Sequence, residues 1–396
     1  MEDKVSFSGK ALKLNDESDA QPIVDAIVDC LNLRILDLEG NTLGIDAAKA
    51  IGKALESKPT LENANFKDLF TGRLKTEIPD AIRYLTAGIT LANAKLVELD
   101  LSDNAFGPIG VKALLPFLQS DSCQALRELR LNNNGLGIEG GKLLATALKN
   151  LRHLEFLICG RNRLENDAAI AFGNALSNIS TLKRLEMPQN GIKAEGIEAL
   201  SRAIKANPKL EILNLNDNIM TSRGGEAIAA ALENAEHIEV INFGDCLLRK
   251  NGCKALLESL SRGGVLRNVK ELILNGNEIG GYELAELIIG VFSDSSIDFR
   301  NVKLDLGFNN FGTNLCDRIK EKLRGKIDLT LSDDEGSADE EGDEEYEEEE
   351  EEESENDEGE EGGDEQETEE DTEETKQRED IEEITKIVEN VCISSS

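Results

Sequence analysis

The sequence predicts an α/β fold, a leucine-rich repeat horseshoe built as a right-handed solenoid. The frame L-x-x-L-x-L-x-x-N, typical of such repeats, recurs along the chain. Its last position is spaced by 28 residues at every step between Asn134 and Cys246, which leaves room for one strand and one helix per repeat. Between the frames, apolar residues recur three and four positions apart, as they do on one face of a helix. These observations together predict long repeats of about 28 residues.

The copies of the frame share apolar residues at three positions and, in most cases, a closing asparagine. They are found at residues 33–41, 96–104, 126–134, 154–162, 182–190, 210–218, 238–246, 269–277 and, in a weaker form, 304–309. The closing asparagine is expected to turn inward and to bond the loop backbone, since buried backbone groups require partners. We make this prediction for Asn41, Asn104, Asn134, Asn190 and Asn218.

Four segments are predicted from these patterns. Residues 1–32 form an N-terminal cap, in which Ile23, Ile27 and Leu31 would face the first repeat from a helix. Residues 33–331 form the leucine-rich repeat domain. Residues 332–375 form an acidic disordered tail, because they contain too few apolar residues to fold. Residues 376–396 carry an apolar stripe suited to a short C-terminal helix.

One repeat is irregular. Its frame at residues 61–69 fits loosely, and the next frame asparagine, Asn104, lies 35 residues after Leu69 instead of 28. The surplus falls in residues 70–79, between the expected strand and helix. An irregular segment on a rigid scaffold often carries function, although a tolerated loop insertion would explain the same pattern.

The negative charge of the chain is concentrated in the predicted tail. The net charge is −36, and 29 of the 79 acidic residues lie within 332–375, where no basic residue occurs. Nucleic acid is therefore not an expected partner, because phosphate binding requires a basic surface. A basic protein remains possible as a partner.

Seven cysteines contain no C-x-x-C pair, and several stand at apolar frame positions, which favours buried thiols in a reducing compartment. We expect no metal and no cofactor. We also expect no membrane span, since no apolar run of 18 residues is present. A monomer is the expected state.

A column of residues directly precedes the closing asparagine of each frame, at the C-terminal end of each expected strand. It reads Gly40, Asp68, Asp103, Asn133, Arg161, Gln189, Asp217, Asp245, Gly276 and Phe308. Its early half is polar and mixed in charge, which the frame does not require. We interpret this half, with the loop around Arg73 at one end, as a surface for a partner's active site. For Arg161 and Arg163, an ordinary surface charge explains the sequence equally well.

Several blocks of the sequence resemble the Ran GTPase-activating protein family. They are FTGRLKTEIP at 70–79, LSDNAFGP at 101–108, CGRNRLEN at 159–166, PQNGI at 188–192, VINFGDC at 240–246 and the acidic run from Leu331. The resemblance extends over about residues 5–350. It is more specific than a shared repeat, because the blocks differ from one another and from the frame.

The resemblance implies activation of GTP hydrolysis on Ran, the small GTPase of nuclear transport. In that family the arginine that matches Arg73 is needed, and the amide that matches Asn133 orients Ran's own catalytic glutamine. Lys75, Asp103, Arg161, Asn162 and Arg163 are carried over as partner contacts. The resemblance implies a cytoplasmic protein that binds Ran-GTP. It leaves open a perinuclear location and a ternary complex with a Ran-binding protein.

A second function class remains open from the residues alone. A leucine-rich repeat scaffold or inhibitor could bind a protein on its concave face without catalysing anything. Most horseshoes only bind, so periodicity by itself favours this reading. The family blocks favour the activator, which would be an enzyme activator and not itself an enzyme.

Overall fold

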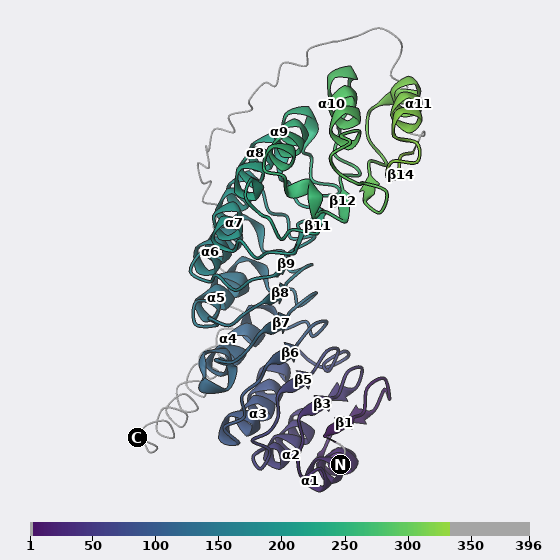
Figure 1. The fold of residues 1–396 in the computed structure, drawn as a ribbon. Coiled ribbons are helices and arrows are strands. Elements are labelled where there is room, and N and C mark those ends of the chain that lie inside the picture. Colours follow the sequence, from purple (N-terminus) through teal and green to yellow (C-terminus); the bar gives the residue numbers. More distant parts are fainter. Residues whose placement is uncertain (1–2, 333–396) are drawn as a thin grey trace, which may run out of the picture. The chain divides into compact units, whose positions relative to one another are not determined.

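The structure, a computed structural model, describes residues 3–332. In this part of the chain the strands form a parallel twelve-stranded sheet in the order β1-β3-β5-β6-β7-β8-β9-β10-β11-β12-β13-β14. The helices lie on the other side of the repeats from this sheet, and each packs against the next helix along the chain (Figure 1). The predicted α/β solenoid of leucine-rich repeats is therefore confirmed.

The strands of the large sheet are short and share one register. They are β1 (Lys4–Ser6), β3 (Ile35–Asp37), β5 (Asn63–Asn65), β6 (Glu98–Asp100), β7 (Glu128–Arg130), β8 (Phe156–Ile158), β9 (Arg184–Glu186), β10 (Ile212–Asn214), β11 (Val240–Asn242), β12 (Glu271–Ile273), β13 (Lys303–Asp305) and β14 (Asp328–Thr330). A separate pair joins β2 (Lys13–Leu14) to β4 (Thr42–Leu43).

The helices are the second half of each repeat. They are α1 (Glu17–Asp29), α2 (Ile45–Leu55), α3 (Ile78–Leu91), α4 (Gly107–Gln119), α5 (Gly137–Leu148), α6 (Glu165–Leu176), α7 (Ala194–Ala206), α8 (Thr221–Leu232), α9 (Arg249–Arg262), α10 (Tyr282–Phe292) and α11 (Gly312–Leu323). Two short 3-10 turns, Asp121–Cys123 and Val265–Arg267, precede β7 and β12.

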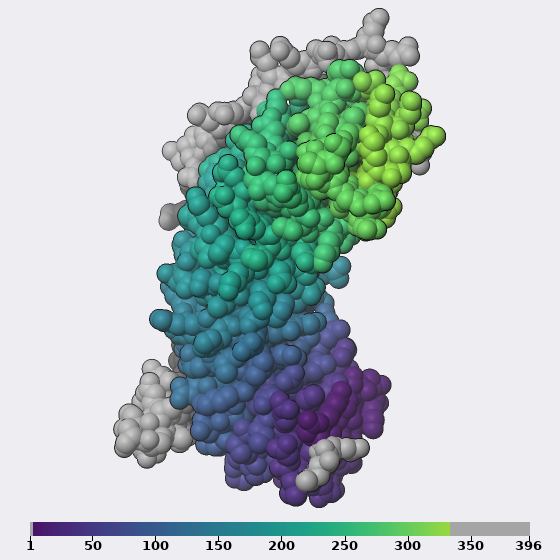
Figure 2. Space-filling view, viewed as in Figure 1, coloured from purple at the N-terminus to yellow at the C-terminus, as the bar shows by residue number. Residues whose placement is uncertain are grey.

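The frame leucines build the core. In the repeat around β7, Leu126, Leu129 and Leu131 are fully buried, and the equivalent residues of the other repeats are buried with them. A fully buried leucine contributes about 1.5–3 kcal/mol relative to an exposed one. The sequence colours succeed one another in bands along residues 3–332 (Figure 2). Each repeat thus buries its apolar face against its neighbours only, as in other solenoids.

A ladder of buried asparagines holds the strand ends together, as predicted. The Asn104 N–H donates to Asn134 Oδ1 over 3.1 Å, and the Asn134 N–H donates to Asn162 Oδ1 over 2.9 Å. Each asparagine also donates its Nδ2 hydrogens to backbone carbonyls, as Asn104 does to Phe66 and Leu101. The ladder fixes where each loop leaves the sheet, and so fixes the rim.

The two ends of the described stack differ from the sequence prediction in detail. Ile23 and Ile27 are buried on α1 as expected, but the helix ends at Asp29 and the Leu31 side chain is 83% exposed. The prediction that Leu31 faces the first repeat is therefore wrong. At the other end, β14 adds a strand beyond the last frame that the sequence revealed.

The insertion after β5 lies between strand and helix, as predicted. Residues 66–77 contain no regular element, and α3 begins only at Ile78. Phe70 anchors the segment in the core, where its ring lies 6.0 Å from that of Phe106. The tail and C-terminal helix predicted for residues 332–375 and 376–396 lie, except for Ser332, outside the described residues. No helix of the described part is long and apolar enough to span a bilayer.

Candidate functional site

The predicted column along the rim shares one unusual backbone conformation. Every member has a positive φ, from 50° at Asp68 to 73° at Gly40. The backbone N–H of each residue from Gly40 to Gly276 donates to a carbonyl of the next repeat, as Asn133 does to Gly160 over 2.9 Å. Left-handed backbone costs an ordinary residue about 1–2 kcal/mol, and after glycine it is asparagine and aspartate that tolerate it best. The column is thus held rigidly, one residue per repeat.

The three consecutive amides in the repeat of β7 have three different roles. Asn134 is fully buried and belongs to the ladder. Asn132 accepts the Gly160 N–H over 2.6 Å through its Oδ1 atom, which joins two repeats. Asn133 is exposed, and its Nδ2 atom donates to Asp103 Oδ1 over 2.9 Å. Of the three, only Asn133 is exposed to solvent.

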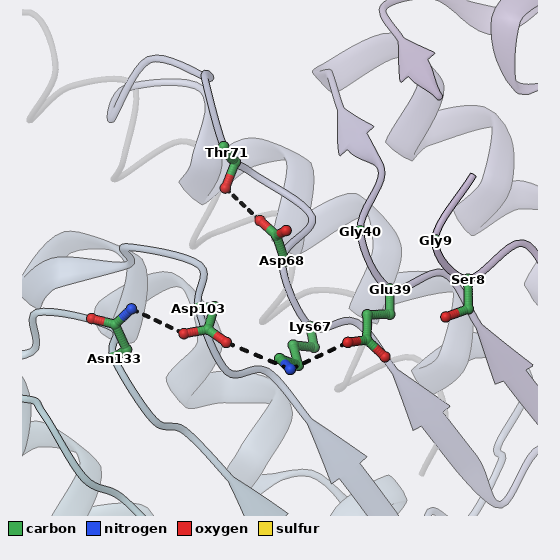
Figure 3. Close-up of a pocket in the computed structure, with 9 residues that line it drawn as sticks. All are labelled: Ser8, Gly9, Glu39, Gly40, Lys67, Asp68, Thr71, Asp103 and Asn133. Atoms are coloured by element: carbon green, nitrogen blue, oxygen red, sulfur yellow. Dashed lines mark hydrogen bonds and ion pairs between the residues drawn. The ribbon is translucent and has the colours of Figure 1, made fainter. Parts of the chain in front are cut away.

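A hollow of about 440 Å³ opens on the rim beside Asn133. Its floor carries a connected row of side chains, which we call the rim row: Glu39, Lys67, Asp103 and Asn133 (Figure 3). Lys67 Nζ lies 3.2 Å from Glu39 Oε1 and 3.8 Å from Asp103 Oδ2. The four residues come from four successive repeats.

The charge of Lys67 is fixed by this arrangement. Its hydrogen bond to Glu39 raises the pKa of the Lys67 ammonium above its ordinary value, and the carboxylates of Glu39, Asp103 and Asp100 add to that effect against a partial desolvation. Lys67 therefore stays protonated at neutral pH. The cation lies between two carboxylates and attracts both, weakly because all three groups are partly exposed.

Arg73, predicted as a functional residue, is bonded within the chain. Its Nε atom donates to Thr42 Oγ1 over 2.8 Å, and its Nη2 atom donates to the carbonyls of Thr42 and Leu14 over 3.0 and 3.1 Å. The guanidinium fork thus ties the insertion to the small sheet of β2 and β4. Neighbouring Leu74 is 67% exposed and Lys75 is exposed at the outer part of the insertion.

The two predicted arginine contacts, Arg161 and Arg163, differ in their surroundings. Arg161 donates to the Gln189 side chain, and Gln189 Nε2 in turn donates to Asp217 Oδ2 over 2.7 Å. Arg163 is exposed, with a positive φ of 53°.

The prediction that Asn162 contacts the partner is wrong. Its side chain is fully buried in the ladder, where Nδ2 donates to the Leu131 carbonyl over 2.8 Å and Oδ1 accepts the Asn134 N–H. A buried side chain cannot contact a partner directly. It belongs with the structural asparagines because it closes a frame, a signal that the sequence already contained.

Sequence reasoning missed Lys67 and Glu39. Both stand one position before the column, where Ser102 and Asn132 stand in later repeats. Only the charges themselves could have marked them, and such charges are common on surfaces. The described residues contain no cluster of metal-ligating side chains.

Comparison with known proteins accords with this geometry. A family model described as Leucine Rich repeat matches residues 29–52, 92–115, 122–145, 178–201 and 206–229. The chain is 50% identical over 178 residues to Ran GTPase-activating protein 1 of Xenopus laevis, 45% identical over 178 residues to the Ran GTPase-activating protein of Drosophila melanogaster, and 35% identical over 178 residues to Ran GTPase-activating protein 1 of Saccharomyces cerevisiae. Over the aligned part, the chain is similar to Ran GTPase-activating proteins of three species.

The aligned part is limited on both sides. It covers 42% of this chain in all three cases, which is less than the stretch over which the sequence blocks resemble the family. It covers 31%, 30% and 43% of the three relatives. The chain thus matches less than half the length of these family members.

Proposed function

We propose that the chain activates GTP hydrolysis on Ran by orienting the catalytic glutamine of the GTPase with Asn133. The three relatives are named as Ran GTPase-activating proteins, which describes this activity for them. The observation that carries the proposal is the Asn133 amide. It stands exposed on rigid left-handed backbone, and within residues 3–332 no hydrogen bond reaches its Oδ1 atom.

The chemistry suits an activator that holds no nucleotide. Phosphoryl transfer depends mostly on positioning and electrostatics, and an activator can raise the rate by about 10³–10⁵. A carboxamide has one acceptor and two donor hydrogens, so it can fix the orientation of another carboxamide. It cannot serve as a base. Asn133 would supply geometry, while the GTPase supplies the nucleotide, the magnesium ion and the water-positioning group.

The other residues support this role in different ways. Arg73 holds the insertion next to the hollow through its bonds to Thr42 and Leu14. We therefore propose that Arg73 shapes the interface and does not reach into the partner's active site. Lys75, Arg161 and Arg163 are exposed and basic, and we propose them as contacts for acidic groups of the partner. Cytoplasmic residence, and a complex that also contains a Ran-binding protein, are part of the same proposal.

Single-turnover GTP hydrolysis by purified Ran, with and without the full chain, tests the function. We expect acceleration by orders of magnitude, and a maximal rate that falls on the order of 10²-fold in Asn133→Ala, as when one positioned polar group is removed from other active sites. Arg73→Ala should lower both rate and affinity. Asp245→Ala, further along the same column and away from the proposed contacts, is the matched control and should retain the rate.

The alternative function predicts a different result. A scaffold or inhibitor would bind Ran tightly and leave the hydrolysis rate unchanged or slower. Full single-turnover activity of Asn133→Ala would show that the orienting role is assigned to the wrong residue, even if the wild-type chain accelerates hydrolysis.

A further inference from the structure

We propose that Asp103 is a positioning residue that fixes the orientation of the Asn133 amide, and that Lys67 and Glu39 hold Asp103 in place. The inference rests on the proposed function for its consequence in catalysis. It changes the expected role of Asp103 from a partner contact to a group that acts through Asn133. It also adds Lys67 and Glu39, which the sequence did not suggest.

The first step is the direction of the hydrogen bond. An ionised carboxylate only accepts hydrogen bonds, so the Asn133 side chain must turn its NH₂ group toward Asp103. The 2.9 Å contact between Asn133 Nδ2 and Asp103 Oδ1 has this sense. The Oδ1 atom of Asn133 then faces away from the rim row, as Figure 3 shows. An amide free to turn by 180° would present its acceptor in only part of the population.

The second step is what holds Asp103. Its second oxygen, Oδ2, lies 3.8 Å from Lys67 Nζ, and Lys67 is held from the other side by Glu39 Oε1 at 3.2 Å. The backbone of Asp103 is also fixed, with φ of 60° and its N–H bonded to the Asn132 carbonyl over 2.9 Å. These contacts favour the orientation in which the carboxylate faces Asn133.

The third step is the comparison with the rest of the column. Gln189 and Asp217 form the same kind of amide-to-carboxylate contact two repeats away, over 2.7 Å. There, however, the amide oxygen of Gln189 already accepts a hydrogen bond from Arg161. Both ends of Gln189 are thus occupied, whereas Asn133 keeps its acceptor available. This contrast makes Asp217 a matched control for Asp103.

The orientation can be measured without any GTPase. In the full chain labelled with ¹⁵N, the side-chain amide signals of Asn133 are assigned by their loss in Asn133→Ala. Asp103→Asn should shift these signals strongly, and Lys67→Met should shift them less. Asp217→Asn should shift Gln189 signals and leave those of Asn133 in place. Unchanged Asn133 signals in Asp103→Asn would overturn the inference, whatever the hydrolysis assay shows.

A double-mutant cycle in the hydrolysis assay tests the consequence. Asp103→Asn should lower the maximal single-turnover rate by roughly tenfold, with little change in the half-saturating concentration, because a charge-assisted contact that orients the amide is lost. In an Asn133→Ala background the same substitution should have no further effect. Asp217→Asn should leave the rate unchanged in both backgrounds.

The outcomes separate the inference from the proposed function. An equal loss in both backgrounds, or a loss confined to the half-saturating concentration, would make Asp103 a direct partner contact and overturn the inference. If the wild-type chain accelerates nothing while the Asn133 signals respond to Asp103→Asn, the proposed function fails and the positioning of the amide stands.

Discussion

At the scale of single residues, neighbouring asparagines on the rim differ in what they do for the fold. Asn134→Ala should lower the free energy of unfolding by about 2–4 kcal/mol, because it removes buried bonds to the Leu101 and Asn132 carbonyls and leaves the Asn104 N–H without its acceptor. Asn133→Ala should cost about 1 kcal/mol, from the left-handed backbone alone.

Urea denaturation of the full chain, followed by circular dichroism, measures both variants. An equal loss of unfolding free energy in the two variants would show that the buried bonds of Asn134 do not stabilise the fold more than Asn133 does. The pair also controls the hydrolysis assay, since a loss of rate in the stable Asn133→Ala variant cannot then be attributed to unfolding.

At the scale of elements, glycines set how closely adjacent helices approach. A Cβ atom at Gly88 of α3 would lie 2.0 Å from the Gly52 carbonyl oxygen of α2. A Cβ atom at Gly52 would lie 2.3 Å from the backbone carbonyl oxygen of Tyr84 in α3. Gly88→Ala should therefore destabilise the chain by about 1–3 kcal/mol, since the two helices must move apart.

The matched control for this substitution is Gly290→Ala in α10. Gly290 is exposed, and nothing lies within 4 Å of an added Cβ atom. Alanine should stabilise that helix by about 0.5–1 kcal/mol through its higher helix propensity. Thermal unfolding of both variants checks the contrast. A stabilising Gly88→Ala would mean that α2 and α3 pack less tightly than the structure shows.

At the scale of the whole molecule, the repeat pattern predicted most of the fold because each frame position has the same environment in every repeat. The leucines, the ladder and the insertion before α3 follow from spacing alone. The exposure of Leu31 and the strand β14 do not, because a terminal repeat lacks a neighbour on one side and departs from the frame. Within the rim row, Asp103 and Asn133 were predicted from their place in the column, whereas Lys67 and Glu39 were not, because isolated surface charges carry no signal in the repeat frame.

Four thiols buried across the middle of the stack give a test of its integrity at high pH. Burial raises the pKa of Cys123, Cys159, Cys246 and Cys253 to about 12, from an ordinary value of 9.0. The folded chain keeps these protons while the unfolded chain loses them near pH 9. Their contribution to stability is therefore complete below pH 9 and is lost as the pH rises from 9 toward 12, by on the order of 1 kcal/mol per pH unit for each thiol.

Urea denaturation between pH 8 and 11 should show this fall in the free energy of unfolding. Cys123 and Cys253 owe their shift to burial alone, so a variant that combines Cys123→Ala with Cys253→Ala should show a shallower decline. Parallel declines in the two proteins would assign the effect to other groups, such as lysines.

At pH 8, without urea, a thiol reagent should label these four cysteines only as fast as the stack opens. Rapid labelling of one or two of them would show that single repeats open independently of their neighbours.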